Sequence, residues 1–152
     1  RDSLWNFSIV DLAALLIRRP NEDDLLLRYD DLIEEWSAIR GEENITALLN
    51  VSRARKYIDF LETMEVERWL GPNQSAAAQA LLSPALTLHL RTRVVSNEGE
   101  ELGTKTRILE VAPISPSPNN KFFYGRVAGD PDYFVLSLES YQRLTLPLVE
   151  TN

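Results

Sequence analysis

The chain has 152 residues, of which 44% are hydrophobic, and its 16 basic and 23 acidic side chains give a net charge of −7. One domain commonly takes ~100–200 residues, and folded proteins are ~45–50% apolar, so composition predicts one domain over residues 1–152 and argues against disorder. The negative charge disfavours nucleic-acid binding, and the absence of Cys excludes thiol catalysis, disulfides and Cys-ligated zinc. No run of residues approaches the ~18 apolar positions that a membrane-spanning helix needs.

The first third of the chain predicts an antiparallel meander of three strands. Leu12–Arg19 and Leu25–Tyr29 are rich in Leu and Ile, and Glu35–Ile39 is a third apolar segment. The acidic segment after Pro20 and the Gly41 segment have the composition of turns. Because short turns join these strands, we expect neighbouring strands to pair with one another.

The middle of the chain predicts two helices. Apolar residues recur at three- and four-residue spacing from Val51 to Met64, which indicates one amphipathic helix. Asn50 or Asn44 could be its N-cap, and a start near Asn50 is favoured. We expect this helical region to stop at Gly71-Pro72. A second, short helix is predicted over Ala76–Leu82, before Ser83-Pro84.

The second half predicts further strands and a closing helix. Leu86, Leu88 and Leu90 alternate with polar residues, which is typical of a half-buried strand. The expected strands are Leu86–Val94, Lys105–Ala112, Lys121–Ala128 and Tyr133–Leu138, and the expected helix is Glu139–Leu144. The predicted fold class is therefore α+β, with an antiparallel sheet built from a three-strand meander and four further strands. We expect the two central helices and the short C-terminal helix to pack on one face of this sheet.

Aromatic residues cluster in the last two predicted strands. If Phe123 and Phe134 lie on the core side, then Phe122 and Tyr124 lie on the other side. Together with Tyr133, these two residues form a candidate partner-binding surface, because exposed aromatic groups are enriched at interfaces. The alternative is that helices or another domain cover both faces of the sheet.

His89 is the only histidine. It alternates with the leucines of its predicted strand and shares a face with Thr87, Arg91 and Arg93. We expect a solvent-facing residue whose pKa these cationic neighbours depress. A Ser/His/Asp triad would depend on this one side chain, so the sequence gives no support for one.

Two short motifs admit either a structural or a functional interpretation. Asp130 and Asp132 flank Pro131 and could hold Ca²⁺ or Mg²⁺, but a β-turn is favoured because calcium loops supply more oxygen ligands. Pro113-Ile114-Ser115-Pro116 has PxxP spacing, but a proline-stiffened hairpin loop is favoured because no Arg or Lys flanks the stretch on its N-terminal side. There is no glycine-rich phosphate loop, and the sequence assigns no catalytic residue, metal or cofactor.

Several segments resemble, in order, a bacterial family of envelope proteins, the domain of unknown function 4340 family. Its members are often encoded beside auxiliary proteins of gliding-type ABC transporters. The segments that carry the resemblance are Arg1-Asp2-Ser3-Leu4-Trp5-Asn6-Phe7, Trp36, Leu81-Leu82-Ser83-Pro84, Leu86-Thr87-Leu88, Tyr124-Gly125-Arg126-Val127-Ala128-Gly129-Asp130 and Phe134-Val135-Leu136. The Pro113 to Asn120 loop is longer than the hairpin usual in that family.

The resemblance implies a non-catalytic, extracytoplasmic domain that binds protein or peptide partners, within a transporter-associated envelope complex. It also implies a periplasmic location and a membrane anchor outside this chain. Because the sequence begins at Arg1, we expect a segment excised from a longer protein, with ~20 apolar residues upstream. The alternatives are a hydrolase that uses Asp130, Asp132 and a further carboxylate, with or without a metal, and a structural spacer unit.

Overall fold

The computed structural model describes residues 4–150, so the start of the family resemblance, Arg1 to Ser3, lies outside the described residues. Nine strands in this part of the chain form one antiparallel sheet in the order β4-β3-β2-β1-β6-β7-β8-β9-β5. The strands are β1 (Leu12–Arg18), β2 (Leu25–Asp30), β3 (Glu35–Arg40), β4 (Glu43–Asn44), β5 (Arg68–Gly71), β6 (Leu86–Val95), β7 (Glu101–Pro113), β8 (Phe122–Val127) and β9 (Tyr133–Ser137). The helices are α1 (Val51–Thr63), α2 (Ser75–Ala80) and α3 (Leu138–Leu144), with short 3₁₀ turns at Ile9–Asp11 and Thr46–Leu48.

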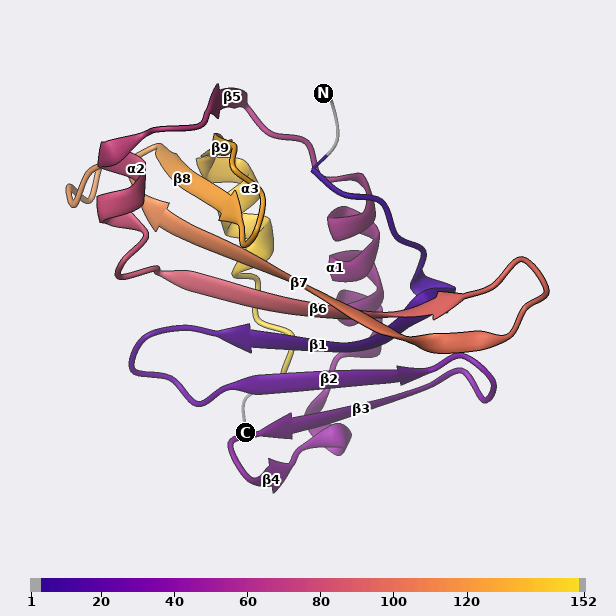
Figure 1. Cartoon of the computed structure of the whole chain (residues 1–152). Coiled ribbons are helices and arrows are strands. Elements are labelled where there is room, and N and C mark those ends of the chain that lie inside the picture. The colour runs from indigo at the N-terminus through magenta and orange to yellow at the C-terminus, as the bar shows by residue number, and fades with distance from the viewer. Residues whose placement is uncertain (1–3, 151–152) are drawn as a thin grey trace.

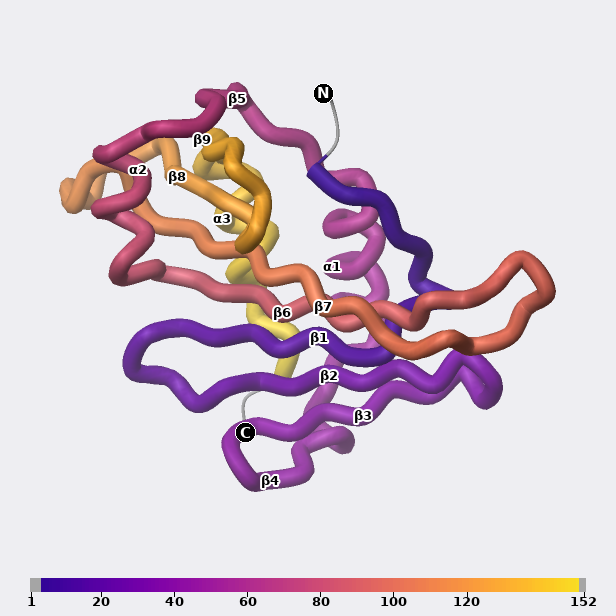
Figure 2. Tube along the Cα trace, in the orientation of Figure 1, coloured from indigo at the N-terminus to yellow at the C-terminus, as the bar shows by residue number. Residues whose placement is uncertain are grey.

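The pairing of β1 with β6 joins the N-terminal meander to the C-terminal strands (Figure 1). Leu15 lies opposite Leu90, and Ile17 lies opposite Leu88. The β6–β7 hairpin is the longest in the sheet, and its tip extends past the ends of the neighbouring strands (Figure 2). The two edges of the sheet are the shortest strands, β4 and β5, which limits the backbone left open to unwanted pairing.

The core lies on one face of the sheet, as the alternation in β6 predicts. Leu86, Leu88 and Leu90 are fully buried, whereas Thr87 and His89 are only half-buried. The fully or nearly fully buried residues of neighbouring strands belong to the same core cluster, namely Leu15, Leu27, Ala38, Leu109, Phe134 and Leu136. One cluster thus spans both halves of the sheet.

Two helices contribute to this core. Asn50 caps α1, because its side-chain oxygen accepts a hydrogen bond from the Arg53 N–H at 3.0 Å, as predicted. The buried face of α1 carries Tyr57, Ile58 and Leu61. In α3, the ring of Tyr141 stacks on buried Phe123 of β8 at 3.9 Å. Both helices lie behind the sheet in Figure 1.

The predicted α+β class is confirmed: three helices accompany the nine-stranded sheet in the part of the chain that the structure describes. The expectation that the helical region runs to Gly71-Pro72 is wrong. Helix α1 ends at Thr63, and residues 68–71 form β5, which pairs with β9. The two-residue strand β4 was not expected either. Both additions are edge strands that form through pairing partners rather than through a strong pattern of their own.

The C-terminal segment 148–150, which we call the strap, is hydrogen-bonded to the segment that leads into α1. The Asn50 N–H donates to the Leu148 carbonyl and the Glu150 N–H donates to the Leu48 carbonyl, both at 2.8 Å. The Asn50 side-chain amide also donates to the Glu150 carboxylate at 2.8 Å. Residues 148–150 are therefore held by the segment that leads into α1.

Candidate functional site

The candidate aromatic surface is built by the alternation of β8 and β9. Phe123 and Gly125 face the core, where Gly125 lies opposite Phe134. A side chain at position 125 would collide with the Phe134 ring, so this glycine lets the ring close over the strand. Phe123 and Phe134 share the core face, as the sequence predicts, and Phe122 and Tyr124 are therefore directed to the opposite face.

The structure places Phe122, Tyr124 and Tyr133 on this opposite face, which we call the aromatic face. Phe122 is 46% exposed, whereas Tyr124 and Tyr133 are half-buried. Tyr124 lies opposite Val135 in the pairing of β8 with β9. Phe122 is therefore the most accessible member of the predicted set.

Arg126 extends the aromatic face and was missed by the sequence analysis. Its Nη1 donates to the Tyr133 hydroxyl at 3.3 Å, and its guanidinium carbon lies 5.4 Å from the centre of the Tyr133 ring. Its Nε is buried without a hydrogen bond to any residue that the structure describes. The signal was present in the sequence, because Arg126 has the same strand parity as Phe122 and Tyr124.

Two separate hollows adjoin the aromatic face. Phe122 lines one of about 300 Å³ together with Arg68, Ile114 and Val135. Tyr133 and Arg126 line the other, of about 490 Å³, with polar residues that lead into α2, Asn73, Gln74 and Ser75. The three predicted residues therefore do not converge on one pocket. This arrangement suits contacts spread along a partner segment better than the enclosure of one small molecule.

The proline-rich stretch forms a hairpin loop, as favoured from the sequence. The Ile114 N–H donates to the Phe122 carbonyl at 3.1 Å, and the Ser115 N–H donates to the Asn120 side-chain oxygen at 3.0 Å. Ile114 is 40% exposed and lines the hollow beside Phe122. The loop therefore adds an apolar residue to the rim of the aromatic face.

Asp130 and Asp132 form the predicted turn. The Asp130 N–H donates to the Val127 carbonyl at 2.9 Å, and the Asp132 N–H donates to the Asp130 carboxylate at 3.0 Å. This carboxylate-to-backbone bond is an Asx turn, which fixes the Asp130 side chain against its own chain. Within residues 4–150, no group of three His, Asp or Glu side chains is arranged to hold a metal ion.

His89 lies in the middle of the sheet surface, opposite Leu16 of β1 and Ile108 of β7. Its pKa is lowered, first because burial among its neighbours disfavours the imidazolium and second because of Arg18; Asp24 and Glu110 oppose this shift. The expected direction is confirmed, but the expected cause is corrected, because burial and Arg18 dominate rather than Arg91 and Arg93.

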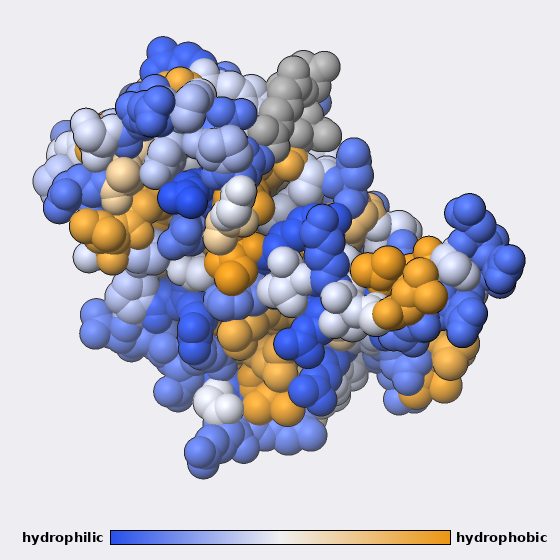
Figure 3. All heavy atoms as spheres, in the orientation of Figure 1, coloured by the Kyte–Doolittle hydropathy of each residue, from blue (hydrophilic) through white to orange (hydrophobic). Residues whose placement is uncertain are grey.

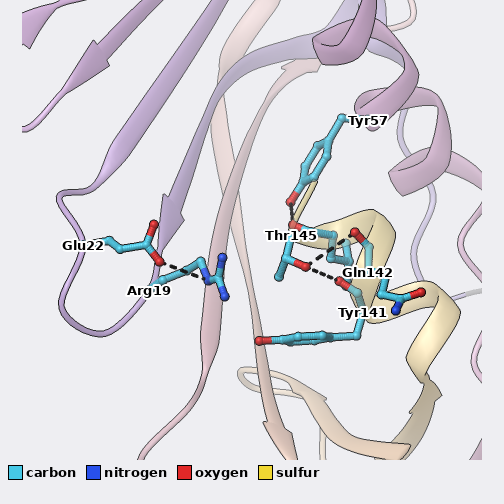
Figure 4. A network of polar contacts seen from close by, with 7 residues as sticks. Arg19, Glu22, Tyr57, Tyr141, Gln142 and Thr145 are labelled. Atoms are coloured by element: carbon cyan, nitrogen blue, oxygen red, sulfur yellow. Dashed lines mark hydrogen bonds and ion pairs between the residues drawn. The ribbon is translucent and has the colours of Figure 1, made fainter. Parts of the chain in front are cut away.

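A polar network that is buried at Tyr57 and partly buried at Thr145 lies at the end of α3 (Figure 4). The Tyr57 hydroxyl donates to the Leu144 carbonyl at 2.7 Å, and the Thr145 hydroxyl donates to the Tyr141 carbonyl at 2.9 Å. Burial raises the pKa of Tyr57 well above its usual value, with a smaller opposing effect from Arg19. The Tyr57 hydroxyl therefore stays protonated and acts as a structural donor between α1 and α3.

Comparison with known proteins assigns no family or function to the chain. No family model, no curated protein and no solved structure matches the chain.

Among the helices of residues 4–150, none has the length and apolar character needed to cross a bilayer.

Proposed function

We propose that this chain is a non-catalytic protein- or peptide-interaction domain that binds its partner through the aromatic face. The observation that carries the proposal is the 46% exposure of Phe122 on a sheet strand, beside a hollow lined by Ile114 and Val135. Aromatic and arginine side chains next to apolar hollows are the usual anchors of interfaces. Tyr133 and Arg126 form an aromatic–arginine pair at the other end of the face, beside the hollow that Asn73, Gln74 and Ser75 line.

The proposal includes the arrangement of the helices. We take α1 and α3 to cover the core face of the sheet, so that most of the opposite face is free for a partner. Phe123 and Tyr141 stack between β8 and α3, which supports this arrangement at the C-terminal strands. The short helix α2 contacts β8 and limits the aromatic face on one side.

The proposed setting follows the family resemblance. We propose that the domain belongs to an extracytoplasmic, transporter-associated complex of the bacterial envelope and is anchored by a segment outside this chain. Protease treatment of intact cells, spheroplasts and lysed cells tests the location of the full-length protein. We expect digestion once the outer membrane is opened, and protection until the inner membrane is lysed would contradict the periplasmic location.

The binding surface is tested by placing a photoreactive benzoylphenylalanine at position 122 of the full-length protein in its own cells. Leu32 is the matched control, because it is 94% exposed in the β2–β3 turn, away from β8 and β9. We expect a discrete crosslinked protein from position 122 but not from position 32. With that protein purified, Phe122→Ser or Tyr133→Ser should weaken binding by about tenfold or more, as loss of an anchor does. Equal affinities for these variants and Leu32→Ser would contradict the proposal.

A further inference from the structure

A straight row of four aliphatic side chains and His89 crosses five strands on the face opposite the core. Ile39 lies opposite Leu26, and Leu26 lies opposite Leu16. Leu16 in turn lies opposite His89, and His89 lies opposite Ile108. Directly opposed residues in antiparallel strands have Cβ atoms ~4.5–5.5 Å apart, so these five residues are direct neighbours across the sheet. We call Ile39, Leu26, Leu16, His89 and Ile108 the apolar row.

The apolar row is separate from the hydrophobic core. Its four aliphatic members are half-buried and none packs against the core cluster, whereas Leu15, Leu27 and Ala38, one position away, are fully or almost fully buried in it. Figure 3 shows the corresponding apolar area over β1, β2 and β3, surrounded by hydrophilic residues. A contiguous apolar area on one open sheet face is typical of an interaction surface.

The two sides of the row differ in charge. On one side, Arg28 and Arg91 are both register neighbours of Ala14, and both are exposed. Neither forms an ion pair with another residue of the described part of the chain. On the other side, Arg18 is already paired with Asp24 at 2.8 Å. Free positive charge therefore flanks one side of the row, although the chain as a whole carries −7.

We propose that the apolar row docks an amphipathic helix of a protein partner, with acidic side chains of that helix meeting Arg28 and Arg91. Four inter-strand spacings of ~4.8 Å make the row ~19 Å long. At 1.5 Å per residue, a helix of about 13 residues covers this length, with apolar residues every three or four positions. The surface does not include Phe122, Tyr124 or Tyr133, so this inference stands or fails separately from the binding role of the aromatic face.

His89 should make binding at this surface dependent on pH, because it lies between Leu16 and Ile108 at the centre of the contact. The charged groups around it are Arg18 of β1, Asp24 of the β1–β2 turn, Glu110 of β7 and Arg91 of its own strand. Covering the ring with an apolar helix disfavours the imidazolium further. Because the pKa of His89 is already lowered in the free chain, binding should weaken only at a pH below the ordinary histidine pKa of about 6.5.

The test uses two labelled helical peptides that differ only in charge. Both carry Leu at three- and four-residue spacing; one has Glu along a flank of its apolar face and the other has Lys. Fluorescence anisotropy with the purified chain at neutral pH and low salt should show at least about tenfold tighter binding of the Glu peptide. Leu16→Thr and Arg91→Glu should each weaken that binding by about tenfold, whereas the exposed control Leu32→Thr should leave it unchanged. His89→Leu should retain binding and remove the loss that occurs above pH ~5, where the Glu side chains of the peptide are still charged.

Several results would overturn the inference. These are equal affinity for the Glu and Lys peptides, binding of neither, or identical affinities in Leu16→Thr and Leu32→Thr when both variants give the circular dichroism and melting temperature of the parent chain. Binding of the chain to anionic phospholipid vesicles but not to the Glu peptide would assign the row to a membrane surface instead. Dimerisation that Leu16→Thr abolishes, seen by sedimentation without peptide, would assign it to a second copy of the chain.

Discussion

Tyr57 shows how one buried hydroxyl couples stability to pH. The hydroxyl donates to the Leu144 carbonyl, and burial raises its pKa above that of an unfolded tyrosine. The folded state therefore holds this proton at a pH where the unfolded state has released it. The contribution of Tyr57 to the free energy of unfolding is complete below pH ~10 and falls as pH rises beyond it. Tyr57→Phe should cost about 1–3 kcal/mol at neutral pH, because the carbonyl loses its donor.

Urea unfolding at a series of pH values measures both effects. Above pH ~10, the free energy of unfolding should fall less steeply in Tyr57→Phe than in the parent chain, because the variant has lost the shifted group. The other four tyrosines titrate in both proteins and serve as the internal control. Parallel curves for the two proteins would contradict the role assigned to Tyr57.

Gly125 is a second position at which a single group decides local packing. A methyl group there would collide with ring atoms of Phe134, which is fully buried. Gly125→Ala should destabilise the chain by about 1–3 kcal/mol, as overpacking of a core does. Phe134→Leu removes the obstructing ring, so the double variant should be more stable than the sum of the two single effects predicts. Additive effects in urea unfolding would show that the ring is not the obstacle.

The alternation of buried and half-buried residues along β6 predicts which of its side chains contribute to stability. Leu88 is fully buried and Thr87 is half-buried on the opposite face. Leu88→Ala should cost about 2–5 kcal/mol through lost burial and a residual cavity. Thr87→Ala should change the free energy of unfolding by no more than ~0.5 kcal/mol, because it removes no core contact. Similar losses in both variants would mean that β6 is buried on both faces.

Elements with a local pattern could be predicted from the sequence, and elements without one could not. The alternation of Leu86, Leu88 and Leu90 and the Asn50 cap are local signals, and β6 and α1 form as expected. The segment Arg68–Gly71 has no alternation of its own and becomes β5 by pairing with β9, far along the chain. Such long-range pairing is set by tertiary packing rather than by local preference.

The candidate site could likewise be predicted only in part from the sequence. Strand parity was enough to place Phe122 and Tyr124 away from the core, and it could equally have found Arg126. The two hollows depend on β5, the proline-rich loop and the entry to α2, which meet β8 and β9 only in the folded chain. The apolar row depends on the register of four strand pairs, because moving one strand by a single residue would direct its members to the core.

At the scale of the whole molecule, the shared core predicts cooperative unfolding. Trp36 of β3 and Trp69 of β5 lie near opposite edges of the sheet, and both pack on the one core cluster. Two variants that each keep one of these tryptophans, with Trp5 and the other replaced by Phe, report on the two edges separately. Within each variant, the urea midpoint from fluorescence should coincide with the midpoint from far-ultraviolet circular dichroism. A fluorescence midpoint that departs from the circular dichroism midpoint would indicate two independently folding units and contradict the prediction of a single domain over residues 1–152.

The hydrogen bonds that join residues 148–150 to residues 48–50 also determine how a mechanical force would pass through the domain. A pull applied at Glu150 acts first on its backbone bond to Leu48 and on its side-chain bond to Asn50. The load is therefore delivered to the segment that enters α1 before it reaches α3. Because Asn50 also caps α1, the same residue resists both the fraying of that helix and the peeling of the strap. The mechanical strength of this end of the domain is thus concentrated in a few polar contacts around one asparagine.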